Sequence, residues 1–99
     1  MMNKIILITT EGCIACNIAE KILSKAIKQC DIRDIKVEVV GFLYNKYKEL
    51  VKRESISDFP ATIFLKDDNV VDKFVGTTSV PQLISRIEYC FSSCRDDSK

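Results

Sequence analysis

Two cysteines separated by two residues are the clearest chemical feature of the sequence. Cys13 and Cys16 stand in the stretch TEGCIACN, where an apolar run ends and a helical pattern starts. Such a pair suits dithiol–disulfide exchange, binding of a soft metal through thiolates, or the ordinary packing of two buried thiols. The sequence holds no histidine, so Cys-His dyads and mixed Cys/His zinc sites are excluded. Any chemistry therefore rests on thiols alone.

The place of the pair at the start of a predicted helix favours exchange. Two cysteines at this spacing can approach to disulfide distance while the first sulfur faces solvent. The first sulfur also lies near the unpaired N–H groups and the positive dipole end of the helix, which favour its thiolate. Glu11 opposes this effect and the loop carries no Lys or Arg, so we expect Cys13 to be only modestly more ionised than an ordinary thiol. Cys16, one turn into the helix, should be more buried.

The elements expected around the pair alternate between strands and helices. Residues 4–10 predict a central strand, and apolar positions at three- and four-residue steps predict an amphipathic helix over 14–30. Further patterns predict a strand at 35–40, a short helix at 44–54, a hairpin of strands 61–65 and 70–75, and a last helix capped by Ser79. The strand patterns place four phenylalanines in the expected core: Phe42, Phe59, Phe64 and Phe74. Of these, Phe59 could also line a substrate groove.

The resulting order, β-α-β-α-β-β-α, defines an α/β fold class. A strand, helix and strand in succession imply a parallel pair, and the hairpin adds antiparallel strands. We therefore expect one domain over residues 1–99, with a four-stranded mixed sheet and helices on both faces.

This order and two stretches of sequence resemble the thioredoxin-like family. The first stretch is ILITTEGCIACNIAEKIL, which contains the cysteine pair, and the second is ISDFPATIFLKDDNVVDKFVGTTSVPQLISRI. In the second, Pro60 before the hairpin, Gly76 after the last strand and Ser79 at the last helix follow the family's order and spacing. The resemblance extends over essentially the whole chain and implies a minimal thioredoxin fold.

The resemblance also implies an activity. It implies a thiol–disulfide oxidoreductase in which Cys13 attacks a substrate disulfide and Cys16 resolves the mixed disulfide. It implies that the Phe59–Pro60 bond is cis, that Pro60 lies beside the cysteine pair, and that the main chain of Phe59 pairs with a bound peptide. We assign Phe59, Pro60 and Gly76 to substrate binding and expect no cofactor and no metal. The implied partners are protein disulfide substrates and an unidentified reductase or low-molecular-weight thiol.

The sequence departs from the family's pattern around the cysteines. Gly12 stands where a tryptophan usually precedes the first cysteine, and Ile14 and Ala15 replace the usual Gly-Pro. Leu7 occupies the place of a buried carboxylate thought to assist proton transfer. These changes leave the fold and the dithiol chemistry in place, but they do not favour recognition by a thioredoxin reductase.

Three alternatives stay open at this point. One is a glutaredoxin-like, glutathione-dependent reductase, although Gly76-Thr77-Thr78 replaces the Gly-Gly and Asp usual after the last strand. A second is a Cu(I) carrier, because EGCIACNIAEKIL also resembles the heavy-metal-associated family, in which a strand hairpin should follow the first helix. The third is a redox-inert binding module on the same fold, since a fold alone does not imply activity.

The other three cysteines are expected far from the pair. Cys30 ends the first helix, about 25 Å from Cys13 by the helical rise. The strand order predicts that Cys30, Cys90 and Cys94 collect at the opposite end of the sheet. We expect Cys30 and Cys90 to be small apolar core residues.

Composition narrows the classes of function. Lys and Arg number 15 against 14 Asp and Glu, which gives no sign of nucleic-acid binding. The apolar run at 5–8 is far shorter than the roughly 20 residues that span a bilayer, and shorter than a signal-peptide core. We expect a cytoplasmic monomer with reduced thiols and with neither nucleic-acid nor membrane partners.

Overall fold

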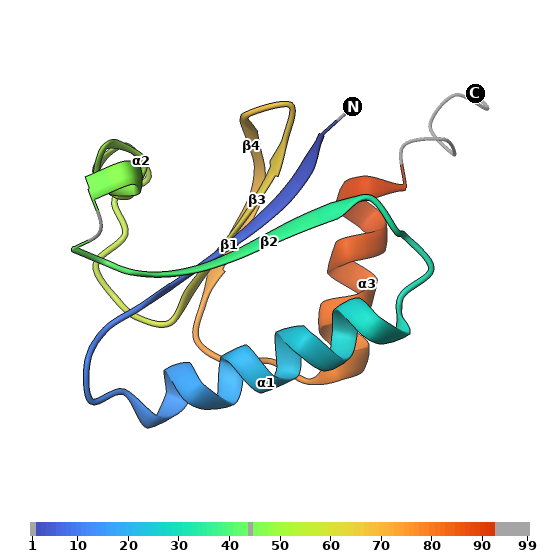
Figure 1. Cartoon of the computed structure of the whole chain (residues 1–99), viewed down its shortest axis with the longest axis horizontal. Helices are drawn as coiled ribbons and strands as arrows, with labels where there is room; N and C mark the ends of the chain where they lie inside the picture. Colours follow the sequence, from blue (N-terminus) through green and yellow to red (C-terminus); the bar gives the residue numbers. More distant parts are fainter. Residues whose placement is uncertain (1, 44, 93–99) are drawn as a thin grey trace.

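The computed structural model describes residues 2–43 and 45–92. The elements, in chain order, are β1 (Asn3–Thr9), α1 (Ile14–Gln29), β2 (Ile35–Gly41), the 3-10 helix η1 (Asn45–Tyr47), α2 (Lys48–Arg53), β3 (Ala61–Lys66), β4 (Asn69–Val75) and α3 (Val80–Phe91). This is the expected β-α-β-α-β-β-α order, with the short second helix preceded by η1 (Figure 1). Tyr44, expected at the start of that helix, lies outside the described residues.

The four strands form one mixed sheet in the order β2-β1-β3-β4. The central strand β1 pairs in parallel with β2 and antiparallel with β3, and β4 pairs antiparallel with β3 at the edge. Residues 5–8 of β1 are almost completely buried, as their unbroken apolar sequence predicts for a strand covered on both faces.

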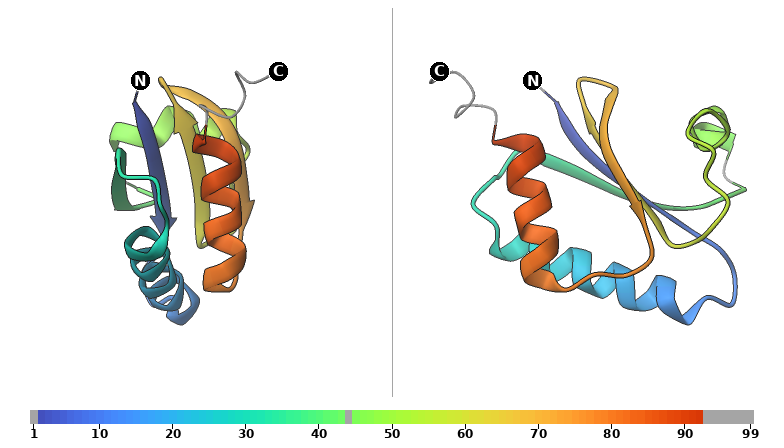
Figure 2. Two further views of the ribbon diagram at one scale, coloured as in Figure 1. Left: turned by 90° about the vertical axis from the view of Figure 1, so that its right-hand side faces the viewer. Right: turned by 180° about the vertical axis from the view of Figure 1, so that it is seen from behind.

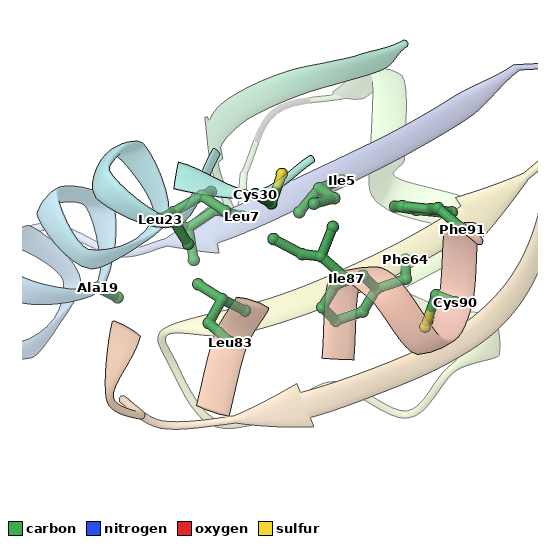
Figure 3. Packing of buried hydrophobic residues seen from close by; sticks show 11 residues of the cluster. Ile5, Leu7, Ala19, Leu23, Cys30, Phe64, Leu83, Ile87, Cys90 and Phe91 are labelled. Atoms are coloured by element: carbon green, nitrogen blue, oxygen red, sulfur yellow. The ribbon is translucent and has the colours of Figure 1, made fainter. Parts of the chain in front are cut away.

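Helices cover both faces of this sheet (Figures 1 and 2). On one face, Ile5 and Phe64 pack against α1 and α3, whose Leu23 and Ile87 close the cluster (Figure 3). On the other face, residues of η1 and α2 pack against the alternate side chains of β1 and β3: Ile6, Ile8, Ala61, Ile63 and Leu65 from the strands, with Tyr47 and Leu50 from the helices. The alternation of side chains along each strand thus builds two apolar layers.

The β3–β4 hairpin closes through two aspartates. Asp67 and Asp68 both have positive φ, at 51° and 71°, which is the backbone conformation that a two-residue hairpin turn requires. Aspartate tolerates this conformation better than most residues. The strands therefore continue one residue further at each side of the turn than the sequence pattern predicts.

The start of α1 extends beyond its packing partner. The apolar spacing predicts one buried stripe along the whole helix, yet Ile14 is 77% exposed and Ile18 is 47% exposed. The prediction is wrong for these first turns because α3 packs only farther along α1, against Leu23 and Ala26 (Figure 1). The N-terminal tip of α1 is consequently accessible to solvent.

The last helix begins and ends with clear caps. The Ser79 hydroxyl oxygen accepts a hydrogen bond from the Gln82 N–H, as expected of an N-cap, and α3 ends at Phe91. Cys94, expected to lie with Cys30 and Cys90 at one end of the sheet, is outside the described residues. Within residues 2–43 and 45–92, no helix combines the length and apolar character needed to cross a membrane.

Candidate active site

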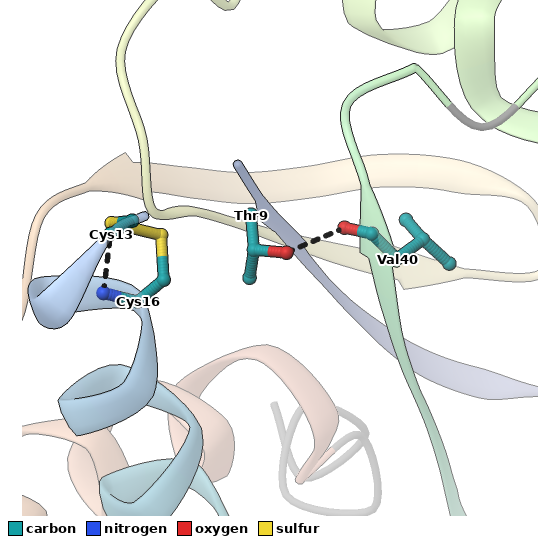
Figure 4. The surroundings of a disulfide bond; sticks show 4 residues. All are labelled: Thr9, Cys13, Cys16 and Val40. Carbon is teal, nitrogen blue, oxygen red and sulfur yellow. Dashed lines mark hydrogen bonds between the residues drawn. A yellow bond between two sulfur atoms is a disulfide. The ribbon is translucent and has the colours of Figure 1, made fainter. Parts of the chain in front are cut away.

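Cys13 and Cys16 form a disulfide at the tip of α1, with their Cα atoms 5.2 Å apart. Cys13 is the N-cap residue and has an extended backbone, while Cys16 lies within the first helical turn. The N–H of Cys16 donates a hydrogen bond to Cys13 Sγ over 3.0 Å (Figure 4). The helix start thus presents one of its otherwise unpaired N–H groups to the leading sulfur.

The two cysteines differ in their exposure to solvent. Cys13 is half-buried, whereas Cys16 is buried, with 3% of its surface exposed. Ile14 and Ala15, between them, face solvent. A molecule approaching from outside therefore meets the Cys13 side of the disulfide first.

The helix dipole and a nearby acidic side chain act in opposite directions on the charge at this tip. The positive end of the α1 dipole and the Cys16 N–H would both stabilise negative charge on Cys13 Sγ once the disulfide is reduced. Glu11, exposed and two residues before Cys13, is the only charged residue between positions 5 and 19. Its carboxylate opposes the effect of the helix.

The sheet register brings the loop before β3 to the same end of the molecule. Ile8 lies opposite Ala61 in the β1–β3 pair, so Pro60 falls opposite the last residue of β1, Thr9. The Gly76 N–H donates a hydrogen bond of 2.8 Å to the Pro60 carbonyl. Pro60 and Gly76 therefore sit at the end of the sheet from which the chain enters α1.

The Phe59–Pro60 peptide bond is cis, as the family resemblance implies. Pro60 is buried and Phe59 half-buried, and the loop that carries them runs past the disulfide in Figure 4. The substrate-binding roles of Phe59, Pro60 and Gly76 stay predictions.

A pocket that the sequence does not predict lies beside this site. It has a volume of about 330 Å³ and is lined by Thr9, Thr10, Glu11, Gly41, Phe42 and Leu43. Phe42, expected in the core, is 38% exposed, and its ring stacks at 5.0 Å against that of Phe59. The prediction fails because Phe42 follows the end of the edge strand β2, beyond the helices that cover the sheet. Gly41, which adds no side chain to this lining, was the signal in the sequence that could have indicated open space here.

The other described cysteines belong to the core. Cys30 is buried at the end of α1, and the carbonyl oxygens of Ile27 and Ile32 both lie within weak hydrogen-bonding distance of its single S–H donor. Cys90 is buried on α3, and burial together with the nearby Asp72 carboxylate raises the pKa of its thiol to about 11. Both belong to the α1–α3 cluster and lie away from the N-terminal tip of α1, as expected (Figures 1 and 3). In the described part of the chain, no group of three or more His, Cys, Asp or Glu residues is placed to hold a metal ion.

Comparison with solved structures identifies the fold. Thioredoxin-2 of the malaria parasite, a component of its protein secretion machinery, superposes with a TM-score of 0.72 and 22% identity over 89% of this chain and 82% of its own. Thioredoxin from Aeropyrum pernix gives 0.71 and 20%, covering 91% and 76% of the two chains. Oxidised mitochondrial thioredoxin 3 from Saccharomyces cerevisiae gives 0.69 and 17%, covering 88% and 77%.

Sequence comparison adds nothing to this, since no protein family and no curated protein matches the chain. At this level of identity the likeness establishes the fold. The chain has the thioredoxin fold in a minimal form, and it carries a Cys-Ile-Ala-Cys disulfide at the first turn of α1.

Proposed function

We propose that this protein is a thiol–disulfide oxidoreductase that exchanges electrons with protein substrates through Cys13 and Cys16. The observation that carries the proposal is the disulfide at the exposed tip of α1, with Cys13 half-buried and Cys16 buried behind it. Cys13 is the attacking nucleophile and Cys16 the resolving cysteine. The Cys16 N–H and the helix dipole support the Cys13 thiolate that the attack requires.

The exchange balances in two steps. In the reduced protein, the Cys13 thiolate attacks one sulfur of a substrate disulfide, so a mixed disulfide forms and the other substrate sulfur leaves as a thiolate that takes a proton from water. The Cys16 thiolate then attacks Cys13 Sγ, which forms the Cys13–Cys16 disulfide and releases the second substrate thiolate. Two electrons pass to the substrate. A reductase or a low-molecular-weight thiol returns them, and the same steps in reverse oxidise a dithiol.

The loop before β3 completes the proposed site. The main chain of Phe59 would pair with the substrate peptide next to the reacting disulfide. Gly76 supports this arrangement because its N–H holds the Pro60 carbonyl at the end of the sheet next to β3. The cytoplasmic location and the monomeric state expected from the sequence remain part of the proposal.

The fold favours exchange over copper carriage. A copper carrier of the kind that the sequence also resembles needs a strand hairpin directly after the first helix. Here α1 is followed by the single strand β2, which pairs in parallel with β1, and then by η1 and α2. This supports the thioredoxin-like alternative.

Insulin reduction by dithiothreitol tests the proposal. The wild-type protein should accelerate it, Cys13→Ser should abolish the acceleration, and Cys16→Ser should accumulate a mixed disulfide with insulin, visible by non-reducing mass spectrometry. Cys30→Ala is the matched control, because it removes a thiol from the far end of α1 and should leave the rate unchanged. Equal rates with the wild type and Cys13→Ser would favour a redox-inert module.

A further inference from the structure

The two edges of the sheet differ in how well they are protected from pairing with another strand. At one edge, β4 departs from its regular register with β3 between Phe64 and Leu65, and such an irregularity hinders further pairing. At the other edge, β2 keeps an unbroken parallel register with β1 from end to end. In Figure 1 this strand runs in front of β1, and no helix crosses it. Within residues 2–43 and 45–92, the outer side of β2 is therefore a regular strand edge without a partner strand.

Alternate residues of β2 present their backbone groups to this open edge. The N–H of Phe42, directly after β2, donates a hydrogen bond to the Thr9 carbonyl of β1. Every second residue back from Phe42 therefore directs its backbone groups towards β1. Val37 and Val39 belong to the other set, so their N–H and C=O groups point away from β1. An incoming strand would bond to these groups, as in other cases of strand addition at a sheet edge.

The side chains of β2 are complementary to those of a second β2 that runs in the opposite direction. One antiparallel register places Val37 opposite Val37 of the second copy and Lys36 opposite its Glu38. One residue further, Ile35 lies opposite Val39. Opposite charges thus meet on one face of the joined sheet, and aliphatic side chains meet on the other. The Lys36 side chain is 64% exposed and Val39 is 40% exposed, so both are available for such contacts.

Charge disfavours the neighbouring registers. A slip of one residue would exchange the two faces of the incoming strand, so the competing registers differ by two residues. The next register on one side places Lys36 opposite Lys36 of the second copy, and the next on the other side places Glu38 opposite Glu38. Like charges directly opposite one another destabilise a strand pair. Of these three registers, the one centred on Val37 is favoured, because it alone pairs opposite charges.

The surroundings of Glu38 also favour a second carboxylate. Three lysine Nζ atoms lie 3.6–3.9 Å from the Glu38 carboxylate oxygens: those of Lys4, Lys36 and Lys46. Three positive charges therefore share one negative charge. In the register centred on Val37, the glutamate of the second copy comes next to Lys36, so lysines and glutamates alternate across the joint.

We propose that two copies of this protein associate reversibly through antiparallel pairing of their β2 strands, centred on Val37, to form one continuous sheet. A contact between the same strand of two copies has two-fold symmetry, so it ends at a dimer. β2 runs parallel to β1, so the two disulfide tips lie towards opposite ends of the joined sheet. The inference goes beyond the proposed function: the monomer remains the unit that exchanges electrons, and association is added as the concentration rises.

Sedimentation velocity tests the association. In dithiothreitol, which prevents disulfides between chains, the wild type should sediment as a monomer at about 10 µM and increasingly as a dimer towards about 1 mM. Lys36→Glu should raise the dissociation constant at least about tenfold, because it turns two attractive charge pairs into repulsive ones. The exposed position of Lys36 should leave the fold of this variant intact. Lys25→Glu, the same charge change at an exposed position of α1, is the matched control and should associate like the wild type.

Cross-linking tests the register. Under a mild oxidant, Val37→Cys should form a disulfide between two copies, because residues in a hydrogen-bonded antiparallel pair have Cα atoms about 5.5 Å apart. Val39→Cys should do so at least about tenfold more slowly, although Val39 is the more exposed residue. Its counterpart lies about 13 Å away along the strand in this register. The wild type under the same oxidant corrects for the native cysteines.

Three results would each overturn the proposal: a wild type that stays monomeric up to about 1 mM, undiminished association of Lys36→Glu, or faster cross-linking of Val39→Cys than of Val37→Cys. None of them would alter insulin reduction, which the proposed function assigns to Cys13 and Cys16. Failure of insulin reduction would likewise leave the association intact, so the two proposals fail separately.

Discussion

The N–H of Cys16 points at Cys13 Sγ from 3.0 Å, so the residue that would resolve the mixed disulfide also stabilises the sulfur that would form it. This contact exists because Cys13 is the N-cap of α1, where the first backbone N–H groups have no partner within the helix. The same contact remains available when the disulfide is reduced and Cys13 carries a negative charge.

Alkylation of the reduced protein should therefore distinguish the two cysteines. At pH 7, iodoacetamide should modify Cys13 at least about tenfold faster than Cys16, because Cys13 is the more exposed and the better stabilised thiolate. Peptide mapping after short reaction times measures both rates. In urea the two rates should become similar, and similar rates in the native protein would contradict the assignment.

Cys90, in contrast to Cys13, should react very slowly with thiol reagents in the folded protein. Its pKa of about 11 leaves about one thousandth of the thiol ionised at pH 8. A maleimide should thus label Cys90 only after the protein unfolds. Labelling of Cys90 in the native state at the rate of an exposed thiol would show that it is not buried against Asp72.

The same thiol makes stability depend on alkaline pH. Folding raises the pKa of Cys90 from 9.0 to about 11, so the folded state holds this proton more tightly than the unfolded state. Its contribution is complete below pH 9 and is lost as the pH rises towards 11. Urea denaturation of the wild type should show this loss, and Cys90→Ala should show a smaller one. Identical slopes in the two proteins would argue against the shift.

Polar contacts around Glu38, on the edge strand β2, should contribute most to the stability of the folded protein near neutral pH. The Tyr47 hydroxyl donates a 2.7 Å hydrogen bond to Glu38 Oε1, and this bond, with the charges of Lys46, Lys4 and Lys36, lowers the pKa of Glu38. The stabilisation is present above the unfolded value of 4.5 and is lost as the pH falls through the lowered folded value.

Tyr47→Phe should therefore cost about 1 kcal/mol of unfolding free energy at pH 7 and less at pH 3. Tyr89→Phe is the matched control, since Tyr89 is 88% exposed and should lose almost nothing. Urea denaturation at the two pH values measures both changes. An equal loss at pH 3 and pH 7 would exclude Glu38 as the partner responsible.

The hairpin turn offers a gain in stability. Asp68 has a φ of 71°, so Asp68→Gly should stabilise the protein by about 0.5–1 kcal/mol, because glycine adopts this conformation without steric cost. Asp68→Val should destabilise it by about 1 kcal/mol or more for the converse reason. Thermal unfolding of both variants checks the sign, and a stabilising valine would contradict the turn geometry.

The fold could be predicted from the sequence because several local signals agree. The apolar run at 5–8 predicts the central strand, the Cys-x-x-C stretch marks the start of α1, and the aspartates mark the hairpin turn. Each of these depends on near neighbours in sequence. The cis bond before Pro60 came from the family resemblance alone, since cis bonds are rare before proline in folded proteins.

The pocket and the exposed tip of α1 could not be predicted in this way. Periodicity identifies which side of a helix is apolar, but not how far a partner helix extends along it, so Ile14 and Ile18 were expected to be buried. The exposure of Phe42 could not be predicted for the same reason, because it depends on where η1 and α2 stop covering the sheet. In both cases the sequence identifies an apolar side chain but not whether another element of the fold extends far enough to cover it.

The Cys13–Cys16 bond joins positions only three apart in sequence. A ring that short restricts the unfolded chain less than a long loop does, so opening it removes only a modest conformational constraint from the unfolded state. The two apolar layers on either side of the sheet contain neither sulfur of the pair, so we expect them to hold the same strands and helices when the bond is reduced. The proposed exchange at the tip of α1 should therefore leave the packing of the core unchanged from one cycle to the next.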